Sequence, residues 1–318
     1  MLRAIHIGGM HVPMYSLMVF LGIVAFFTTY FVTVEKKEGV ERVSSNRLLF
    51  SSGVGIVVLG LSAFVFNSVF HSIEQGRIVI GGITWLGGVV GAFPAMVLLI
   101  HRFVPRAKGN ALYFFSLLVP GIVIGHAFGR LGCFFGGCCY GKVTDSIFGI
   151  SFPEGSTAAL QYPAESGGSL PVFPTQLFEA AFEFVLFAVL MIFRKKLKKY
   201  NIEIYLIAYG VFRFLLEFLR GDDRGTTGFF LSPSQFMCIL LLIAAVLLIL
   251  YRNNIVFKKL NAKCLVWQQE AVLAVNNPPK KKADVSLSTL KELHSMMEEG
   301  IITEQEYEEK KKDILKRL

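Results

Sequence analysis

Residues 12–34 read VPMYSLMVFLGIVAFFTTYFVTV, a run of 23 positions without Asp, Glu, Lys or Arg. A helix of this length can cross a hydrocarbon core of roughly 30 Å. Uncharged runs of the same length recur at residues 48–70, 78–100 and 229–251. Over the whole chain 53% of the residues are hydrophobic and 17% are charged, whereas soluble domains carry about 25% charged residues. The sequence therefore predicts an all-α integral membrane protein.

Three further apolar stretches are interrupted by ionisable side chains. They cover residues 111–135, 174–193 and 204–219. Each is long and is flanked by loops that suit a membrane protein, so we expect about seven transmembrane helices. An ionisable side chain inside a span costs several kcal/mol unless it faces a wet cavity or a partner. Function is therefore expected in these later stretches, with the first three spans as scaffold.

Lys and Arg are distributed unevenly among the expected loops. The loops after the first, third and fifth spans are basic, whereas the loop between the second and third spans contains Arg77 alone. Because cytoplasmic loops retain positive charge, the N-terminus is predicted outside and the C-terminus inside. The net charge of +9 mostly reflects this bias and a basic tail. We therefore expect no nucleic-acid partner.

Three parts are predicted along the chain. Residues 1–255 form the transmembrane domain, and its longest outer connection, about 136–173, is expected to fold as a cap. Residues 256–285 form a cytoplasmic linker with a Pro-Pro-Lys-Lys-Lys run. Residues 286–318 follow a helical spacing of apolar residues and are predicted to form a small cytoplasmic α-hairpin.

The hairpin has recognisable helix ends. Gly300 suits the left-handed end of a first helix, and Thr303 with Glu306 forms a capping box for a second. The pattern LKEL-x6-GIITE-x-EY resembles the short C-terminal domain of the SHOCT type. That resemblance implies an interaction module, so a protein partner or self-association through the hairpin is expected.

The expected sixth span carries four polar residues at spacings of 4, 4 and 3: Tyr209, Arg213, Glu217 and Arg220. This spacing predicts one shared helical face, on which Arg213 and Glu217 can pair. The pair is either a structural bridge between helices or part of a polar cavity lining. In the second case Arg220, near the outer surface, is available to an anion.

The fourth span ends in GHAFGRLGCFFGGCCYG, residues 125–141. His126, Arg130 and Cys133 share a face. Glycines such as Gly129 permit a ligand or another helix to approach the backbone. A guanidinium is well suited to bind a phosphate through two hydrogen bonds. The stretch is either a packing face or, as we favour, a site for an anionic lipid headgroup.

Three cysteines cluster at this end: Cys133, Cys138 and Cys139. A metal site needs another ligand, and the spacing is not a standard one. A disulfide that braces the cap and a reactive thiol are the other possibilities. We favour the structural role, and expect no metal site and no cofactor.

The fifth span opens with Phe-Pro-Thr-Gln-Leu-Phe-Glu, residues 173–179. Pro174 suits the first turn of a helix. Gln176 and Glu179 share a face that Glu183 continues. These side chains are expected either to orient a base or to pair with the arginines of the sixth span.

Taken in order, these motifs resemble the prolipoprotein diacylglyceryl transferase family. The resemblance covers roughly residues 10–250 and rests on the following matches: Tyr15, Gly87-Gly88-x2-Gly91, Gly129-Arg130-Leu131-Gly132, Pro174 to Glu179, Tyr209-Gly-x2-Arg213-Phe-x2-Glu217-x2-Arg220, and Leu231-Ser-Pro-Ser-Gln235. It implies an enzyme in the bacterial cytoplasmic membrane, with its active site facing the outer leaflet.

The implied reaction moves a diacylglyceryl group from phosphatidylglycerol to the lipobox cysteine thiol of a prolipoprotein. Phosphatidylglycerol, the prolipoprotein and other membrane lipids are therefore the expected partners. A base and cations at the leaving phosphate suit this chemistry. The catalytic residues expected are His126, Arg130, Tyr209, Arg213 and Glu217. The substrate-binding residues expected are Tyr15, Gly87, Gly88, Gly129, Cys133, Gln176, Glu179 and Arg220.

The chain departs from the family pattern at three positions. Leu86 replaces a histidine, Cys133 replaces an asparagine, and Cys138 replaces an acidic residue. His126, one helical turn before Arg130, is a candidate for the missing imidazole. The same donor with a different acceptor, a glycolipid or a small thiol, is the alternative enzyme. A non-catalytic lipid-binding scaffold is the alternative outside enzymes.

Overall fold

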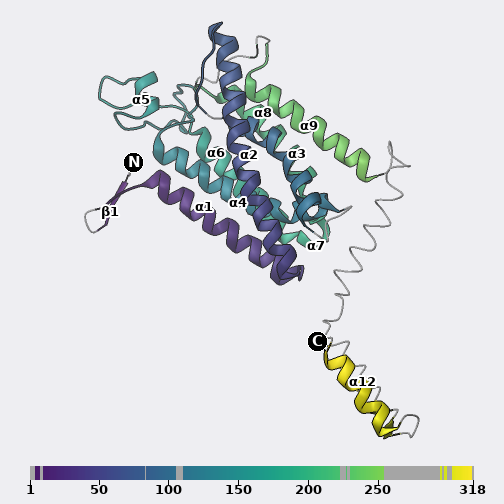
Figure 1. Cartoon of the computed structure of the whole chain (residues 1–318). Coiled ribbons are helices and arrows are strands. Elements are labelled where there is room, and N and C mark those ends of the chain that lie inside the picture. Colours follow the sequence, from purple (N-terminus) through teal and green to yellow (C-terminus); the bar gives the residue numbers. More distant parts are fainter. Residues whose placement is uncertain are drawn as a thin grey trace. The chain divides into compact units, whose positions relative to one another are not determined.

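The structure is a computed structural model that describes residues 4–7, 10–82, 84–104, 110–222, 227, 230–253, 294–295, 297–298 and 303–316. The chain divides into two compact units, Met1–Trp267 and Gln268–Leu318. The elements are β1 (Ala4–Ile7), β2 (Met10–Pro13), α1 (Met14–Tyr30), the π-helix η1 (Phe31–Lys37), α2 (Arg42–Gln75), α3 (Trp85–Phe103), α4 (Ala111–Gly136), α5 (Thr157–Gln161), α6 (Thr175–Ile192), α7 (Arg194–Leu197), α8 (Asn201–Leu216), the 3₁₀ turn η3 (Glu217–Leu219), α9 (Pro233–Arg252) and α12 (Glu304–Lys316) (Figure 1).

Six helices in the described part of the chain are long and apolar enough to cross a membrane: α1 with η1, α2, α3, α4, α6 and α9. The prediction of a largely helical integral membrane protein is confirmed. The seventh expected span corresponds to α8 and η3, which have 16 and 3 residues. It is shorter and carries more charge, so the count of seven and the orientation remain predictions. A short antiparallel hairpin of β1 and β2 precedes α1 and was not predicted.

The third span begins later than its uncharged run suggests. Helix α3 starts at Trp85, not at Ile78. Gly82 has a φ of +69°, a conformation that ends regular structure and favours glycine. The side chain of Asn67 on α2 donates to the carbonyl of Gly81 (2.8 Å). Polar contacts with α2 therefore replace helical hydrogen bonds in this loop, although residues 78–84 contain no charged side chain.

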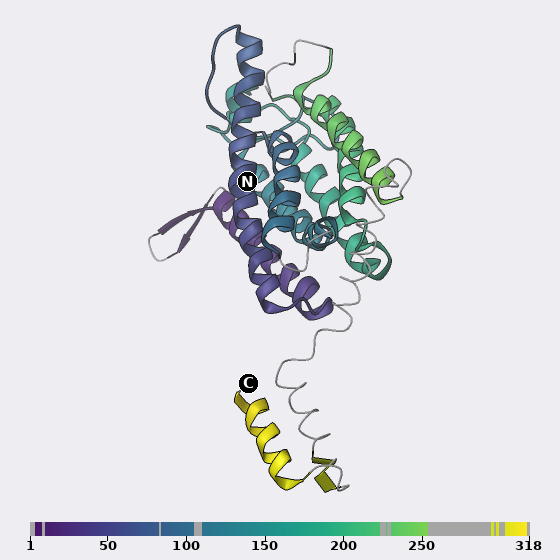
Figure 2. The ribbon, with the colours of Figure 1, turned by 45° about the vertical axis from the view of Figure 1, so that its right-hand side comes forward.

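Helix α4 lies at the centre of the transmembrane unit and is the most buried of the candidate spans. Helices α1 and α6 pack along it, α2 packs along α3, and α8 packs along α9 (Figures 1 and 2). The approach of α1 is close, since a Cβ on Gly22 would lie 3.0 Å from the carbonyl oxygen of Gly125. Small residues permit such backbone contact between membrane helices. The glycines of the fourth span therefore serve packing on this side.

Substitution of Gly91 by Ala is expected to destabilise the α2–α3 contact by about 1–3 kcal/mol through overpacking. A Cβ on Gly91 would lie 2.6 Å from the Cβ of Ser62, so the backbones must move apart. Gly53→Ala on α2 is the matched control, because no heavy atom lies within 4 Å of its new Cβ. Thermal unfolding in detergent should show a loss for Gly91→Ala alone. Equal melting temperatures for the two variants would contradict the packing described here.

The segment between α4 and α6 has an apolar cluster of its own: Tyr140, Phe152, Ala158 and Val172. The Tyr140 hydroxyl contacts the Gln161 side chain (2.5 Å) and the Thr157 carbonyl (3.0 Å). Burial, with the nearby Asp222 carboxylate, raises the pKa of Tyr140 to about 12. Within this segment, residues 147–152 form an isolated β-bridge between Ile150 and Val172.

Charged residues also meet at the opposite ends of the helices. The Glu38 carboxylate pairs with Arg194 and with Lys198 (2.6 Å), and accepts from the Tyr113 hydroxyl (2.7 Å). Glu38 directly follows η1, Tyr113 lies in the first turn of α4, and Arg194 and Lys198 lie at the two ends of α7. All of these positions are expected on the cytoplasmic side. The ionic contacts therefore link distant parts of the chain at that end of the bundle.

In the C-terminal unit, α12 begins with the predicted capping box. Thr303 Oγ1 accepts from the Glu306 backbone N–H (3.4 Å), and the Glu306 carboxylate accepts from the Thr303 backbone N–H (2.9 Å). The His294 ring lies 5.5 Å from the Tyr307 ring between centroids. Most of the first predicted hairpin helix, and all of the expected linker at 256–285, lie outside the described residues.

Candidate active site

Five polar side chains from three helices form a buried ionic cluster: His126 and Arg130 on α4, Glu179 and Glu183 on α6, and Tyr209 on α8. His126 and Arg130 are each 7% exposed, and the other three are fully buried. Such groups are expensive to bury without partners. Their mutual contacts therefore matter both for stability and for any chemistry.

The contacts of His126 indicate which of its ring nitrogens donates and which accepts. Arg130 Nε, which can only donate, contacts His126 Nε2 at 3.1 Å. His126 Nε2 is therefore an acceptor, and the ring proton lies on Nδ1. From there it is donated to Glu183 Oε1 at 2.8 Å. The lone pair of His126 Nε2 is thus directed at the Arg130 guanidinium.

Glu179 joins the other members of the buried ionic cluster. Its Oε1 lies 3.0 Å from Arg130 Nη2 and accepts from the Tyr209 hydroxyl at 2.7 Å. The α6 carboxylates were expected either to orient a base or to pair with the arginines of the sixth span. The structure shows contacts of Glu179 and Glu183 with the candidate base, His126. In the described part of the chain their ion pairs are with α4.

The second oxygens of Glu179 and Glu183 are buried and have no hydrogen-bond partner among the described residues. An unsatisfied buried carboxylate oxygen has a high free-energy cost. Both oxygens can therefore accept further hydrogen bonds, and both lie beside the His126 imidazole and the Arg130 guanidinium.

Aromatic rings enclose the imidazole. Trp85 stacks on His126 with centroids 4.4 Å apart and an angle of 21°, and Tyr209 meets it edge-on at 5.3 Å. Tyr205 stacks in turn on Tyr209. Trp85 precedes Leu86, the position at which the family pattern has a histidine. The imidazole of His126 therefore lies beside the start of α3.

The predicted pair of Arg213 and Glu217 is confirmed, with Arg213 Nη1 2.5 Å from Glu217 Oε2. Two serines at the start of α9 extend it. Arg213 Nη2 donates to Ser234 Oγ (3.2 Å), and Ser232 donates to Glu217 Oε1 (2.8 Å). Both charged groups are already partnered, so this pair also connects α8 to α9.

The prediction that Arg220 continues the helical face of α8 is wrong. Helix α8 ends at Leu216, and Arg220 has an extended backbone after η3. Its guanidinium forms a two-pronged contact with Asp222, at 2.8 and 2.7 Å, and its Nη1 lies 3.4 Å from Thr175 Oγ1. Arg220 is nonetheless buried and reaches the first residue of α6.

The three glycines expected at the substrate site, Gly87, Gly88 and Gly129, have different surroundings. A Cβ on Gly87 would lie 2.6 Å from Phe66 Cβ, and one on Gly88 would lie 2.8 Å from the Leu59 carbonyl oxygen. This pair therefore faces α2, as helix packing requires. Gly129 is different, because no heavy atom lies within 4 Å of its Cβ position.

Tyr15 on α1 covers the end of α4. Its ring lies 3.3 Å from the Cβ position of Gly132 and 3.6 Å from that of Gly136. Gln176 Nε2 donates to the carbonyl of Cys138 at 2.6 Å. Both residues thus lie near the three cysteines that follow Arg130.

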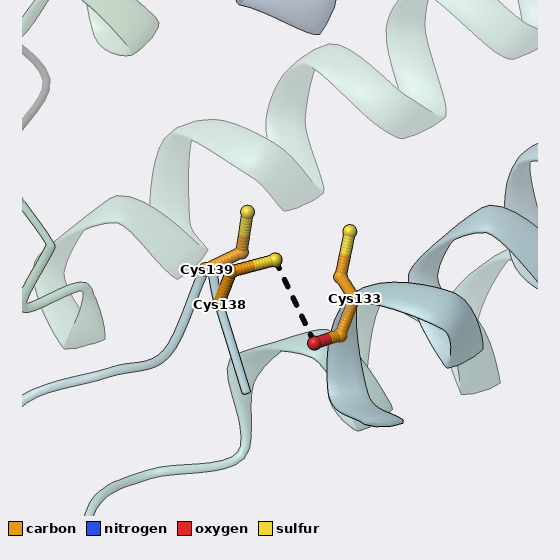
Figure 3. A group of neighbouring side chains, drawn as sticks. All are labelled: Cys133, Cys138 and Cys139. Atoms are coloured by element: carbon orange, nitrogen blue, oxygen red, sulfur yellow. Dashed lines mark hydrogen bonds between the residues drawn. The ribbon is translucent and has the colours of Figure 1, made fainter. Parts of the chain in front are cut away.

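Cys133, Cys138 and Cys139 form a cysteine trio whose Sγ atoms all lie within 4.8 Å of one another. Figure 3 shows Cys133 on the last turns of α4 and the other two on the segment that follows it. No disulfide joins the cysteines of the described residues. The expected disulfide brace is therefore not present in this structure.

Sequence reasoning missed several members of the site. Trp85 and Tyr205 read as ordinary apolar residues of a span, and Ser234 as part of a helix start. Asp222 lies just beyond the charged motif of the sixth span. Only its position two residues after Arg220 offered a signal.

The geometry combines a base with a cation. A carboxylate holds the imidazole in one tautomer, and the lone pair of that imidazole contacts a guanidinium. Glu183 and His126 can accept a proton together, while Arg130 can neutralise an anion in a low-dielectric setting. This arrangement suits transfer reactions that displace a phosphate from carbon.

Comparison with known families agrees with this chemistry. The profile described as prolipoprotein diacylglyceryl transferase matches residues 3–251, and that described as short C-terminal domain matches residues 288–315. A relative named phosphatidylglycerol–prolipoprotein diacylglyceryl transferase 2, from Clostridium perfringens, is 33% identical over 258 residues, which cover 76% of this chain and 91% of the relative.

Two further relatives are named phosphatidylglycerol–prolipoprotein diacylglyceryl transferase. The Clostridium tetani protein is 27% identical over 246 residues, which cover 75% of this chain and 92% of the relative. The Chlorobaculum tepidum protein is 37% identical over 172 residues, 52% of this chain and 54% of the relative. The chain therefore belongs to the prolipoprotein diacylglyceryl transferase family and carries a short C-terminal domain.

Proposed function

We propose that this chain transfers a diacylglyceryl group from phosphatidylglycerol to the lipobox cysteine thiol of a prolipoprotein. The names of its relatives give the donor and the acceptor. The observation that carries the proposal is the contact between Arg130 and the lone pair of a carboxylate-held imidazole. Base and phosphate clamp are thereby adjacent on one helix.

In the proposed reaction the acceptor thiol gives its proton to His126 Nε2. The sulfur then attacks the carbon of the diacylglyceryl group that is bonded to the phosphate oxygen. The new bond is C–S, and the C–O bond to phosphate breaks. The electron pair leaves with glycerol phosphate, whose charge Arg130 stabilises. Glu183 stabilises the imidazolium that forms.

The contact of Arg130 with His126 implies an order of events. While Arg130 Nε donates to His126 Nε2, the lone pair is unavailable as a base. A lipid phosphate that draws the guanidinium toward itself frees that nitrogen. Glu183 meanwhile keeps the proton on Nδ1. Donor binding would thus activate the base, and deprotonation of the acceptor follows.

The remaining predicted residues have supporting roles. Tyr209 and Glu179 hold Arg130 in place, and Arg213 with Glu217 fixes α8 against α9. Arg220 is a second cation for the headgroup. The expected lining for the substrates is Tyr15, Gly129, Cys133 and Gln176, and Gly87 and Gly88 let α3 pack closely against α2.

The site is expected to face the outer leaflet. The buried ionic cluster lies toward the ends of the helices that adjoin residues 137–174, whereas the Glu38 ion pairs lie at the opposite ends. With positive loops inside, the first end faces out. The C-terminal hairpin would then be cytoplasmic, where it binds a protein partner or a second copy.

The function is tested by reconstituting the purified chain with phosphatidylglycerol labelled in its diacylglyceryl part and a lipobox peptide. The proposal predicts label on the peptide thiol and release of glycerol phosphate in equal amount. Label on a glycolipid or a small thiol, with none on the peptide, would show that the lipobox cysteine is not the acceptor. Absence of any turnover would refute the transferase and support a lipid-binding scaffold.

A further inference from the structure

No sulfur of the cysteine trio takes part in the bond changes of the proposed reaction, although Cys133 is among the residues expected to line the substrate site. The three sulfur atoms nevertheless converge. They lie within 4.8 Å of one another and all are partly buried. The cysteines come from the end of α4 and from the segment after it, and Figure 3 shows their sulfur atoms gathered on one side of that turn. Three convergent sulfurs are a donor set that prefers soft cations.

We propose that Cys133, Cys138 and Cys139 bind one thiophilic cation, of the class of Cu(I) or Zn(II), through their three sulfur atoms. The cation takes no part in the bond changes of the diacylglyceryl transfer. Cu(I) is satisfied by thiolate ligands alone, whereas Zn(II) would add one further ligand such as water.

The sulfur positions are close to those that a cation requires. With metal–sulfur bonds of about 2.3 Å, the sulfurs of a tetrahedral or trigonal site lie roughly 3.8–4.0 Å apart. The observed limit of 4.8 Å exceeds this by less than about 1 Å. Rotations about the Cα–Cβ bonds suffice to close that gap.

The backbone of the trio is held by hydrogen bonds. The Cys138 N–H donates to the Cys133 carbonyl (3.2 Å), and Gln176 Nε2 donates to the Cys138 carbonyl (2.6 Å). Thr175 Oγ1 donates to the Cys139 carbonyl (2.9 Å). The start of α6 thus fixes the position of the cysteine pair relative to α4, and little ordering remains for a ligand to impose.

Cys139 provides independent support. Its φ of +63° is the only positive value at a non-glycine position among the described residues. This conformation is strained for a residue with a Cβ, and such strain occurs preferentially at ligand sites.

The charges around the trio favour thiolates bound to a cation. Arg130 interacts electrostatically with Cys133 and Cys139, and Arg220 with Cys139. These guanidiniums offset the negative charge of a metal–thiolate group.

The test uses the full chain, purified in detergent under a non-thiol reductant. Cd(II) serves as the first probe, because its thiolate complexes absorb in the ultraviolet, and Cu(I) is delivered from a chromogenic chelator. Cys238→Ser with Cys264→Ser retains only the trio. The matched control carries serine at 133, 138 and 139 and retains the other two cysteines.

We expect one equivalent of either probe to bind the wild-type chain and the trio-only variant. The control should lack the ultraviolet charge-transfer band of the Cd(II)–thiolate complex. Each single substitution within the trio should also lose it. Alkylation mapped by mass spectrometry gives a measurement on the wild type alone, in which metal should protect the three trio thiols. Equal binding by the control, or alkylation of the trio unchanged by metal, would overturn the proposal.

Discussion

Arg130→Met is expected to lower the rate of diacylglyceryl transfer by about 10²–10³-fold, the effect of removing one donor from a developing anion. The guanidinium contacts both His126 and Glu179, so its loss removes the phosphate clamp. It also leaves a buried carboxylate without its cation, which costs roughly 3–5 kcal/mol of stability. The measurement is the initial rate of peptide labelling at saturating lipid.

A second variant separates the loss of function from the loss of stability. Arg130→Met with Glu179→Gln removes both charges of the pair, so its melting temperature should recover toward that of the wild type, because neutral replacement of a buried ion pair is well tolerated. Its rate should remain low. Arg47→Met, an exposed arginine that contacts the Phe103 carbonyl far along the chain, should transfer at the wild-type rate. Full activity in either variant that lacks Arg130 would exclude it as the clamp.

His126→Gln is expected to lower the transfer rate by about 10²–10⁴-fold, the range for loss of a general base. A glutamine side chain can still contact Arg130 and Glu183, so the fold should persist. The measurement is the initial rate of peptide labelling at saturating lipid, compared between this variant and the wild type.

Placement of the imidazole can be tested by rescue. Trp85, stacked on His126, is the neighbour of Leu86. Leu86→His in a His126→Gln background should restore part of the rate. His101→Gln, near the end of α3 away from the site, is the control and should transfer at the wild-type rate. A wild-type rate in His126→Gln alone would show that another group takes the proton.

The spans could be predicted because burial in a membrane requires long apolar helices, and uncharged runs mark them directly. Their ends were less predictable. The third run includes Ile78–Gly82, but that stretch forms a loop because Asn67 and the conformation of Gly82 satisfy its backbone differently. Arg220 was placed on a helical face because its spacing fitted, although the helix had ended at Leu216.

The sequence predicted which residues form the site better than it predicted which of them contact one another. Spacing identified His126 with Arg130 and Glu179 with Glu183 as shared faces, since residues four apart on a helix are neighbours. It could not reveal that α6 packs against α4, which decides that Glu183 contacts His126. Tertiary contacts across about 50 residues leave no mark in a single sequence. The same reason explains why Trp85 was missed.

The most direct test of the account is a structure of the chain with phosphatidylglycerol bound. The account predicts phosphate oxygens at hydrogen-bond distance from the Arg130 guanidinium, about 2.7–2.9 Å, with the Arg130–His126 contact broken and the His126–Glu183 contact kept. A phosphate bound elsewhere while Arg130 still donates to His126 would contradict it.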